Sequence, residues 1–169
     1  RAPPEVLDAI AAAGVDGVSM ANNHAIDFGP GGLADSLEAR DRSPVPIVGI
    51  GRDVDDAFAP AVFDVDGTSV ALIGATDLID PELRATWTAT ADRPGVASVE
   101  DRDRLVTAVS DAVAAHEVVI VYLHWGRERE TCPIERQTDL AADLVDAGAT
   151  AVVGSHTHRL VGGGYKGSA

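Results

Sequence analysis

The sequence predicts one α/β domain with a mainly parallel sheet that helices cover on both faces. First, strand-like and helix-like segments alternate along the 169 residues. Second, residues 117–123 and 149–153 are nearly continuous apolar runs, which is the pattern of strands buried on both faces. Third, 46% of the residues are hydrophobic and 24% are charged, the make-up of a globular domain.

The first half of the chain alternates helices and strands, in the order helix 5–13, strand 15–21, helix 31–42 and strand 47–50. The first helix follows Pro3-Pro4 and ends before Gly14, because proline suits the start of a helix and glycine the position after its end. Leu33 and Leu37 are four residues apart and therefore lie on one face of the second helix.

The second half continues this alternation after a hairpin, in the order strand 61–66, strand 69–75, loop 77–94, helix 99–115, strand 117–123, helix 133–147 and strand 149–153. Asp66-Gly67 favours a tight turn between the first two of these strands, which are therefore antiparallel. Residues 77–94 have no hydrophobic period, so we expect a long loop there.

The charge and composition exclude several classes of partner and of protein. With 13 basic and 27 acidic residues the net charge is −14, which disfavours nucleic acid and anionic lipid as partners. No apolar stretch reaches the roughly 18 residues of a membrane span. Cys132 is the only cysteine, so no intramolecular disulfide forms. No signal peptide is visible, but the chain begins with Arg1 and is expected to be an internal piece of a longer protein.

Four of the five histidines follow the ends of predicted strands: His24 after 15–21, His124 after 117–123, and His156 and His158 after 149–153. In a parallel sheet these ends meet at one edge, where ligands bind in such folds. A lone histidine is usually a surface or structural residue, but four at one edge favour a metal site. His156 and His158 share one side of an extended chain, so they can chelate one metal or bridge two.

Three other residues near the motifs are considered as structural residues rather than metal ligands. His116 precedes a strand instead of following one, and we expect it to be a structural or surface residue. Cys132 precedes Pro133 at a helix start and is expected to be a bystander. For Trp125 two interpretations stay open, stacking on a ligand or packing in the core.

Three motifs contain these strand-end residues: Ala-Asn-Asn-His-Ala-Ile-Asp-Phe-Gly at 21–29, His-Trp-Gly-Arg-Glu at 124–128 and Gly-Ser-His-Thr-His at 154–158. In order and separation they resemble the CapA family of poly-γ-glutamate capsule biosynthesis proteins. That family is similar to a branch of the calcineurin-like metallophosphoesterase superfamily. The resemblance implies a four-layer α/β/β/α sandwich with a dinuclear metal centre at one edge.

The resemblance also implies a role for each matching residue. Asn23, His124 and His156 are expected to hold one metal ion, and His158 the other. His24 is the expected catalytic residue, in contact with the leaving group or the developing charge. Imidazole, amide and carboxylate ligands suit Mn, Fe or Zn better than Mg or Ca. Two such ions would activate a water for attack on a phosphoryl group.

By the same resemblance, residues 1–169 are one domain of this type that is incomplete at the N-terminus. The family's first motifs would lie upstream and supply acidic ligands, including the carboxylate that bridges the metals. We therefore expect the chain to be inactive alone. The superfamily often has an acidic residue after the Asn-His pair; here that position is Ala25, and Asp27 follows two residues later.

Four charged residues beside the ligand positions are candidates for supporting roles. Asp27 and Glu128 either orient His24 or His124 or are solvated loop carboxylates. Arg127 and Arg159 are candidates to hold an anionic substrate, because a guanidinium matches carboxylate or phosphate.

Three functional hypotheses follow. The first is a metal-dependent hydrolase that cleaves a phosphoester or a related bond with a metal-activated water. The second is a non-hydrolytic component of capsule or cell-surface polymer synthesis that binds or transfers a polyglutamate-like chain. The third, a degenerate metal fold, is disfavoured because all four strand-end histidines are present. The resemblance implies a cell-surface or extracellular location and an anionic small molecule or acidic polymer as partner.

Overall fold

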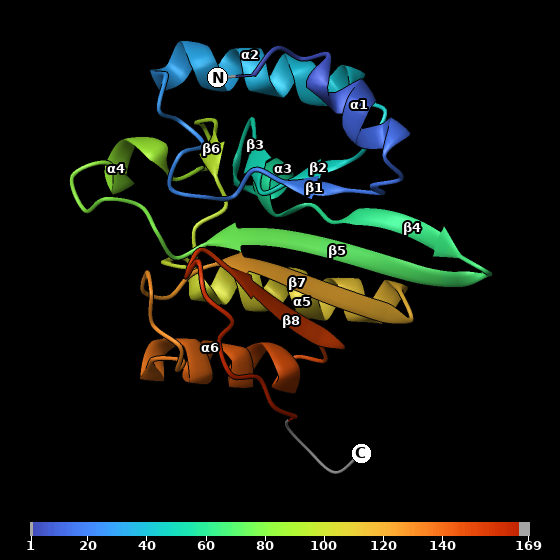
Figure 1. The fold of residues 1–169 in the computed structure, drawn as a ribbon, viewed down its shortest axis with the longest axis vertical. Coiled ribbons are helices and arrows are strands. Elements are labelled where there is room, and N and C mark those ends of the chain that lie inside the picture. The colour runs from blue at the N-terminus through green and yellow to red at the C-terminus, as the bar shows by residue number, and fades with distance from the viewer. Residues whose placement is uncertain (1, 166–169) are drawn as a thin grey trace.

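The chain folds into four layers, which Figure 1 shows from top to bottom. The computed structural model describes residues 2–165. Helices α1 (Val6–Ala12) and α2 (Gly29–Arg42) form the first layer, short strands the second and a four-stranded sheet the third. Helices α5 (Arg102–Ala115) and α6 (Glu135–Asp146) form the fourth. This α/β/β/α sandwich is the fold that the family resemblance implies, whereas the hydrophobic pattern alone predicts a single sheet with helices on both faces.

The larger sheet has the strand order β4–β5–β7–β8. Strands β4 (Ala61–Val65) and β5 (Thr68–Thr76) form the predicted antiparallel hairpin around Asp66-Gly67. Strands β7 (Val118–His124) and β8 (Ala151–Ser155) continue the sheet in parallel with β5. Their carboxyl ends therefore meet at one edge, where Thr76 pairs with His124 and His124 with Ser155.

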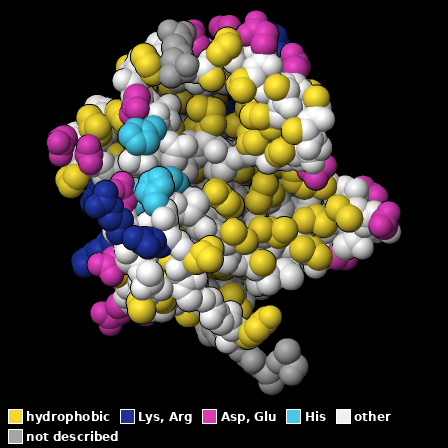
Figure 2. Space-filling model, viewed as in Figure 1, with side chains coloured by type: hydrophobic (Ala, Val, Ile, Leu, Met, Phe, Trp, Pro, Cys, Tyr) yellow, Lys and Arg dark blue, Asp and Glu magenta, His cyan; other side chains and the backbone are white. Residues whose placement is uncertain are grey.

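Only one face of this sheet is fully buried. Along β7, Val119, Val121 and Leu123 lie in the core under α5 and α6, whereas the alternate residues are half-buried. The prediction of a strand buried on both faces is therefore wrong. The physical reason is that the second layer covers only part of the other face, and Figure 2 shows hydrophobic side chains at the surface over these strands.

The second layer consists of two-residue strands. Strand β1 (Val18–Ser19) pairs in parallel with β2 (Ile47–Val48), and β3 (Ile50–Gly51) pairs antiparallel with β6 (Gly95–Val96). The strand expected at 15–21 is thus shorter, and the one expected at 47–50 is divided between two sheets. The division falls at Gly49, whose φ of 87° redirects the chain.

Two short helices are absent from the sequence prediction. Helix α3 (Val54–Phe58) begins at Asp53, whose carboxylate accepts a hydrogen bond from the Asp56 amide. Helix α4 (Arg84–Trp87) lies inside the segment expected to be a loop. Helices of one turn contain too few residues to show a hydrophobic period. Among residues 2–165, no helix has the length and apolarity that a bilayer crossing needs.

Candidate metal centre

The edge of the sandwich brings the predicted metal ligands together. Strand β7 ends at His124, and β8 leads directly into His156. Asn23 follows β1 in the neighbouring layer, and its Oδ1 lies 2.9 Å from His124 Nε2. The ring centroids of His124 and His156 are 4.8 Å apart, and those of His156 and His158 are 5.9 Å apart. Residues from all three sequence motifs therefore form one cluster.

The backbone of the histidine pair differs from the extended chain that the two-residue spacing suggests. His156 and His158 have φ angles of 93° and 54°, in the left-handed region that non-glycine residues rarely adopt. The rings nevertheless stay close together. Such strained backbone concentrates at functional sites and costs roughly 1–3 kcal/mol per residue.

A continuous chain of hydrogen bonds runs along this edge from Asp27 to Ser155. Asp27 Oδ2 lies 2.9 Å from His24 Nδ1, and Asn23 Nδ2 lies 3.3 Å from His24 Nε2. Beyond the contact between Asn23 and His124, His124 Nδ1 lies 3.1 Å from Ser155 Oγ. One set of tautomers satisfies every contact: His24 donates from Nδ1, His124 donates from Nε2, and the Ser155 hydroxyl donates to His124.

A cation bound to both Asn23 Oδ1 and His124 Nε2 would replace the proton between these two atoms. His124 would then carry its proton on Nδ1 and donate it to Ser155, whose hydroxyl accepts as well as donates. Ser155 can therefore hydrogen-bond to His124 Nδ1 both with and without a bound cation. Sequence reasoning missed this residue, although its place between the end of β8 and His156 is a usable signal.

Burial favours the neutral form of two histidines in the cluster. The pKa of His124 is lowered to about 4, chiefly because the ring is half-buried and then because of repulsion from His156. Burial also lowers the pKa of His156, although the Glu128 carboxylate opposes this change. A neutral imidazole has a free lone pair, so His124 is ready to bind a metal at neutral pH.

We expect acid to destabilise the metal-free protein between pH 6.5 and 4. In this window the unfolded chain binds a proton at His124, with its ordinary pKa of 6.5, whereas the folded chain excludes it until about pH 4. The loss is absent above the window and complete below it. It amounts to about 1–2 kcal/mol after allowance for the ring's partial exposure. Urea unfolding in EDTA should show a flatter pH dependence for His124→Gln, and equal slopes would contradict this assignment.

Glu128 lies beside His156 and His158, which the sequence does not suggest as its neighbours. One ligand atom from each of these three residues lies within 4.8 Å of the other two. Arg127 and Arg159 are both exposed, and neither guanidinium forms an ion pair within residues 2–165. Figure 2 shows basic side chains next to histidines at this surface. A role of the two arginines in substrate binding stays a prediction.

The other residues near the motifs take structural positions. Trp125 is buried in the core that includes α5 and α6, and its indole lies against Gly154, so packing is the correct interpretation. His116 is structural as expected, because its Nδ1 lies 2.7 Å from Ser69 Oγ at the opposite end of the sheet. Cys132 is a free, exposed thiol.

The loop after β7 depends on a glycine. Gly126 has a φ of 92°, and a Cβ there would lie 2.8 Å from Gln137 Nε2 and 3.0 Å from Thr157 Cγ2. We expect Gly126→Ala to lower the free energy of unfolding by about 1–3 kcal/mol. Gly31→Ala is the control, because Gly31 lies in α2 with open space around it and alanine favours helix. Urea titrations compare the two, and equal midpoints would contradict the prediction.

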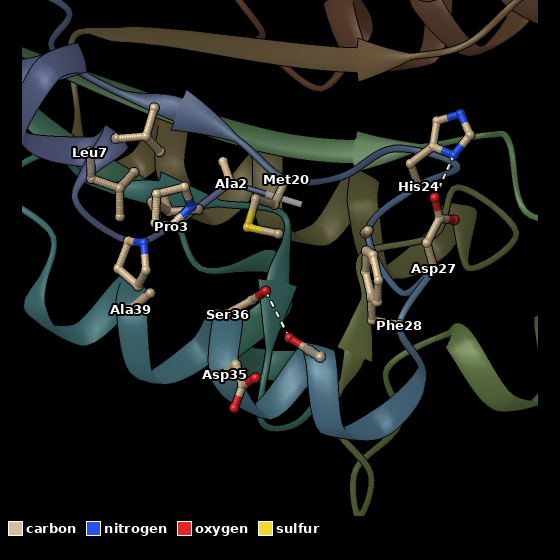
Figure 3. A pocket seen from close by; sticks show the side chains of 15 residues that line it. Ala2, Pro3, Leu7, Met20, His24, Asp27, Phe28, Asp35, Ser36 and Ala39 are labelled. Atoms are coloured by element: carbon tan, nitrogen blue, oxygen red, sulfur yellow. Dashed lines mark hydrogen bonds and ion pairs between the residues drawn. The ribbon is translucent and has the colours of Figure 1, made fainter.

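A mostly apolar pocket of about 800 Å³ adjoins the polar edge. Figure 3 shows His24 and Asp27 at one end, Leu7 and Pro3 at the other, and α2 along one side. Met20 and Phe28 contribute further apolar surface. His24 therefore lies between the ligand cluster and an apolar pocket.

Comparisons with known proteins identify the family and the fold. A family model described as "Bacterial capsule synthesis protein PGA_cap" matches residues 1–166. In a search of solved structures, a "Putative 5'-Nucleotidase" from Staphylococcus aureus superimposes with a TM-score of 0.59 at 15% identity, over 98% of this chain and 36% of that one. This likeness concerns the fold alone.

Several curated relatives are named for capsule or polymer synthesis. "PGA biosynthesis protein CapA" of Bacillus subtilis is 34% identical over 85% of this chain and 37% of its own length. "Capsule biosynthesis protein CapA" of Bacillus anthracis is 34% identical over 94% of this chain and 38% of its own. A "Probable polyglutamine synthesis accessory protein" of Mycobacterium tuberculosis is 30% identical over 94% of this chain and 43% of its own. The chain thus spans well under half the length of these relatives.

Proposed function

Because the chain belongs to the PGA_cap family of bacterial capsule synthesis proteins, we propose that it forms the metal-binding edge of a metal-dependent hydrolase. The bond cleaved is a phosphoester or a related bond, attacked by a metal-activated water. The contact of 2.9 Å between Asn23 and His124 carries this proposal, because it joins two motifs from different layers. His156 and His158 extend the same cluster.

The donor set suits divalent ions. Asn23 offers an amide oxygen, and His124, His156 and His158 offer imidazole nitrogens, of which His124 is neutral well below pH 7. Such nitrogen and oxygen ligands favour Mn, Fe or Zn, and we propose two ions in the complete protein. When bound, these ions lower the pKa of a water and stabilise negative charge on a phosphoryl group.

His24 is the proposed general acid for the leaving group. Asp27 fixes the ring by accepting a hydrogen bond from Nδ1, so Nε2 faces Asn23 and the ligand cluster. The ring is largely exposed, with 71% of its side-chain surface accessible, so a substrate can reach it. Protonated at Nε2, His24 would donate to the departing oxygen. The apolar pocket beside it would receive the organic part of the leaving group.

Asp27→Asn is expected to lower the turnover number about 10–100-fold and leave the metal content unchanged. The amide no longer compensates positive charge on His24 or fixes its tautomer. Metal analysis and steady-state kinetics of the complete gene product measure both quantities. Asp111→Asn, on the exposed surface of α5, is the control and should behave like wild type. A turnover number that is unchanged by Asp27→Asn would mean that the contact between Asp27 and His24 plays no part in the reaction.

The activity itself is tested with an aryl phosphate and Mn²⁺ in the complete gene product. The expected result is that the phenol is released only when Mn²⁺ is present. An aryl phosphate that stays intact while the protein holds metal would argue against a phosphoester substrate.

A second candidate function is non-hydrolytic binding or transfer of an acidic polymer, and the names of the Bacillus relatives favour it. Bound cations and the exposed Arg127 and Arg159 would attract such a polymer to an otherwise acidic chain. In this case poly-γ-glutamate binds in a salt-dependent manner and the aryl phosphate is not cleaved. Cleavage without polymer binding supports the hydrolase.

A further inference from the structure

Three potential ligands of one cation come from two adjacent loops. Glu128 lies on the loop after β7, and His156 and His158 lie on the turn after β8. One ligand atom from each lies within 4.8 Å of those of the other two. Ligands bound to a common metal at about 2.0–2.2 Å lie roughly 3–3.5 Å apart, so these side chains would move closer together when an ion binds.

Backbone hydrogen bonds hold the two loops together. The amide of Arg129, next to Glu128, donates to the carbonyl of Thr157 over 2.7 Å. The Trp125 amide donates to the Ser155 carbonyl over 3.2 Å. Thr157 is the residue between the two histidines, and it is buried. The Glu128 carboxylate is therefore placed beside the imidazoles by main-chain contacts, not by a flexible side chain alone.

The negative charge of Glu128 lies beside the imidazoles of His156 and His158. The carboxylate already acts on His156, where it opposes the effect of burial on the imidazole's pKa. A divalent ion on two imidazoles would keep its full charge, and a carboxylate ligand compensates half of it. Two histidines and one carboxylate are a common open ligand set for Zn²⁺ and Fe²⁺.

We propose that Glu128 is a direct metal ligand and forms, with His156 and His158, a three-ligand site for one divalent ion of the Mn, Fe or Zn class. This inference rests on the proposed function and deepens it. The family resemblance groups His156 with Asn23 and His124, whereas the geometry also groups it with Glu128 and His158. An acidic ligand is then present within residues 1–169 without any contribution from other segments.

Isothermal titration of the metal-free chain with Zn²⁺ and with Mn²⁺ tests the proposal without an activity assay. Glu128→Gln is expected to weaken the binding of one ion at least about tenfold. Glu130→Gln is the matched control, because Glu130 is exposed on the same loop. The metal affinity of this variant should equal that of the wild-type chain. The visible spectrum of the Co²⁺-loaded chain should change with Glu128→Gln and not with Glu130→Gln.

Two further variants separate the possible failures. Asn23→Ala should retain one bound ion, because the three proposed ligands remain. If His156→Ala abolishes binding but Glu128→Gln binds like wild type, Glu128 is not a ligand and the proposed function survives. If the wild-type chain binds neither metal, the three-ligand site is overturned, and the aryl phosphate assay of the complete gene product decides the proposed function. If His156→Ala binds metal as well as wild type, both proposals are overturned.

Discussion

His156→Ala is expected to abolish metal binding and to lower metal-dependent hydrolysis about 10³-fold or more. His156 lies between the other ligands, with its ring centroid 4.8 Å from that of His124 and 5.9 Å from that of His158. Its removal takes a nitrogen donor from the middle of the cluster. A hydrolase that depends on a metal-activated water then loses its nucleophile.

The measurements are the metal content after loading with Mn²⁺ or Zn²⁺ and desalting, and the rate of aryl phosphate hydrolysis in the complete gene product. His116→Ala is the matched control, because this histidine contacts Ser69 at the opposite end of the sheet. It should leave metal content and rate unchanged. A His156→Ala protein with wild-type hydrolysis would refute the metal-dependent mechanism.

Leu123→Ala is expected to lower the free energy of unfolding by about 2–5 kcal/mol, the range for large core residues. Leu123 is inaccessible to solvent and packs in the core with α5 and α6. Ile120→Ala, in the same strand but on the half-buried face, is expected to cost clearly less, about 1–2 kcal/mol. The difference between the two losses of stability follows from the burial of only one face of the larger sheet.

Urea unfolding of residues 1–169 measures both variants, and an unchanged dependence on denaturant shows that the same transition is compared. Similar losses for Leu123→Ala and Ile120→Ala would mean that both faces of β7 are covered in solution. Leu123 directly precedes His124, so a cavity at this position should also weaken metal binding.

Elements with long apolar patterns were predictable from the sequence. The helices at 102–115 and 135–146 and the strands around them follow from hydrophobic period and turn residues. The two-residue strands and the short helices α3 and α4 were not predictable at their true extent, because neither two residues nor a single helical turn contains a hydrophobic period. The partial exposure of Ile120 also escaped prediction, since an apolar run shows what can be buried and not what covers it.

The candidate site, too, was predictable from the sequence only in part. His24, His124, His156 and His158 were identifiable because each follows a strand end, and the order of parallel strands places such ends at one edge. The role of Ser155 and the placement of Glu128 beside the histidine pair were not, because they depend on which loops meet across the sheet.

The sequence by itself determined the family resemblance and, through it, the fold class, and it identified the candidate site residues, because these depend on local pattern and residue type. Only the tertiary structure decided the contact of Asn23 with His124, the hydrogen-bond chain from Asp27 to Ser155 and the low pKa of His124. Distances between distant segments and the burial of a ring arise from packing of the layers, and no local pattern contains them.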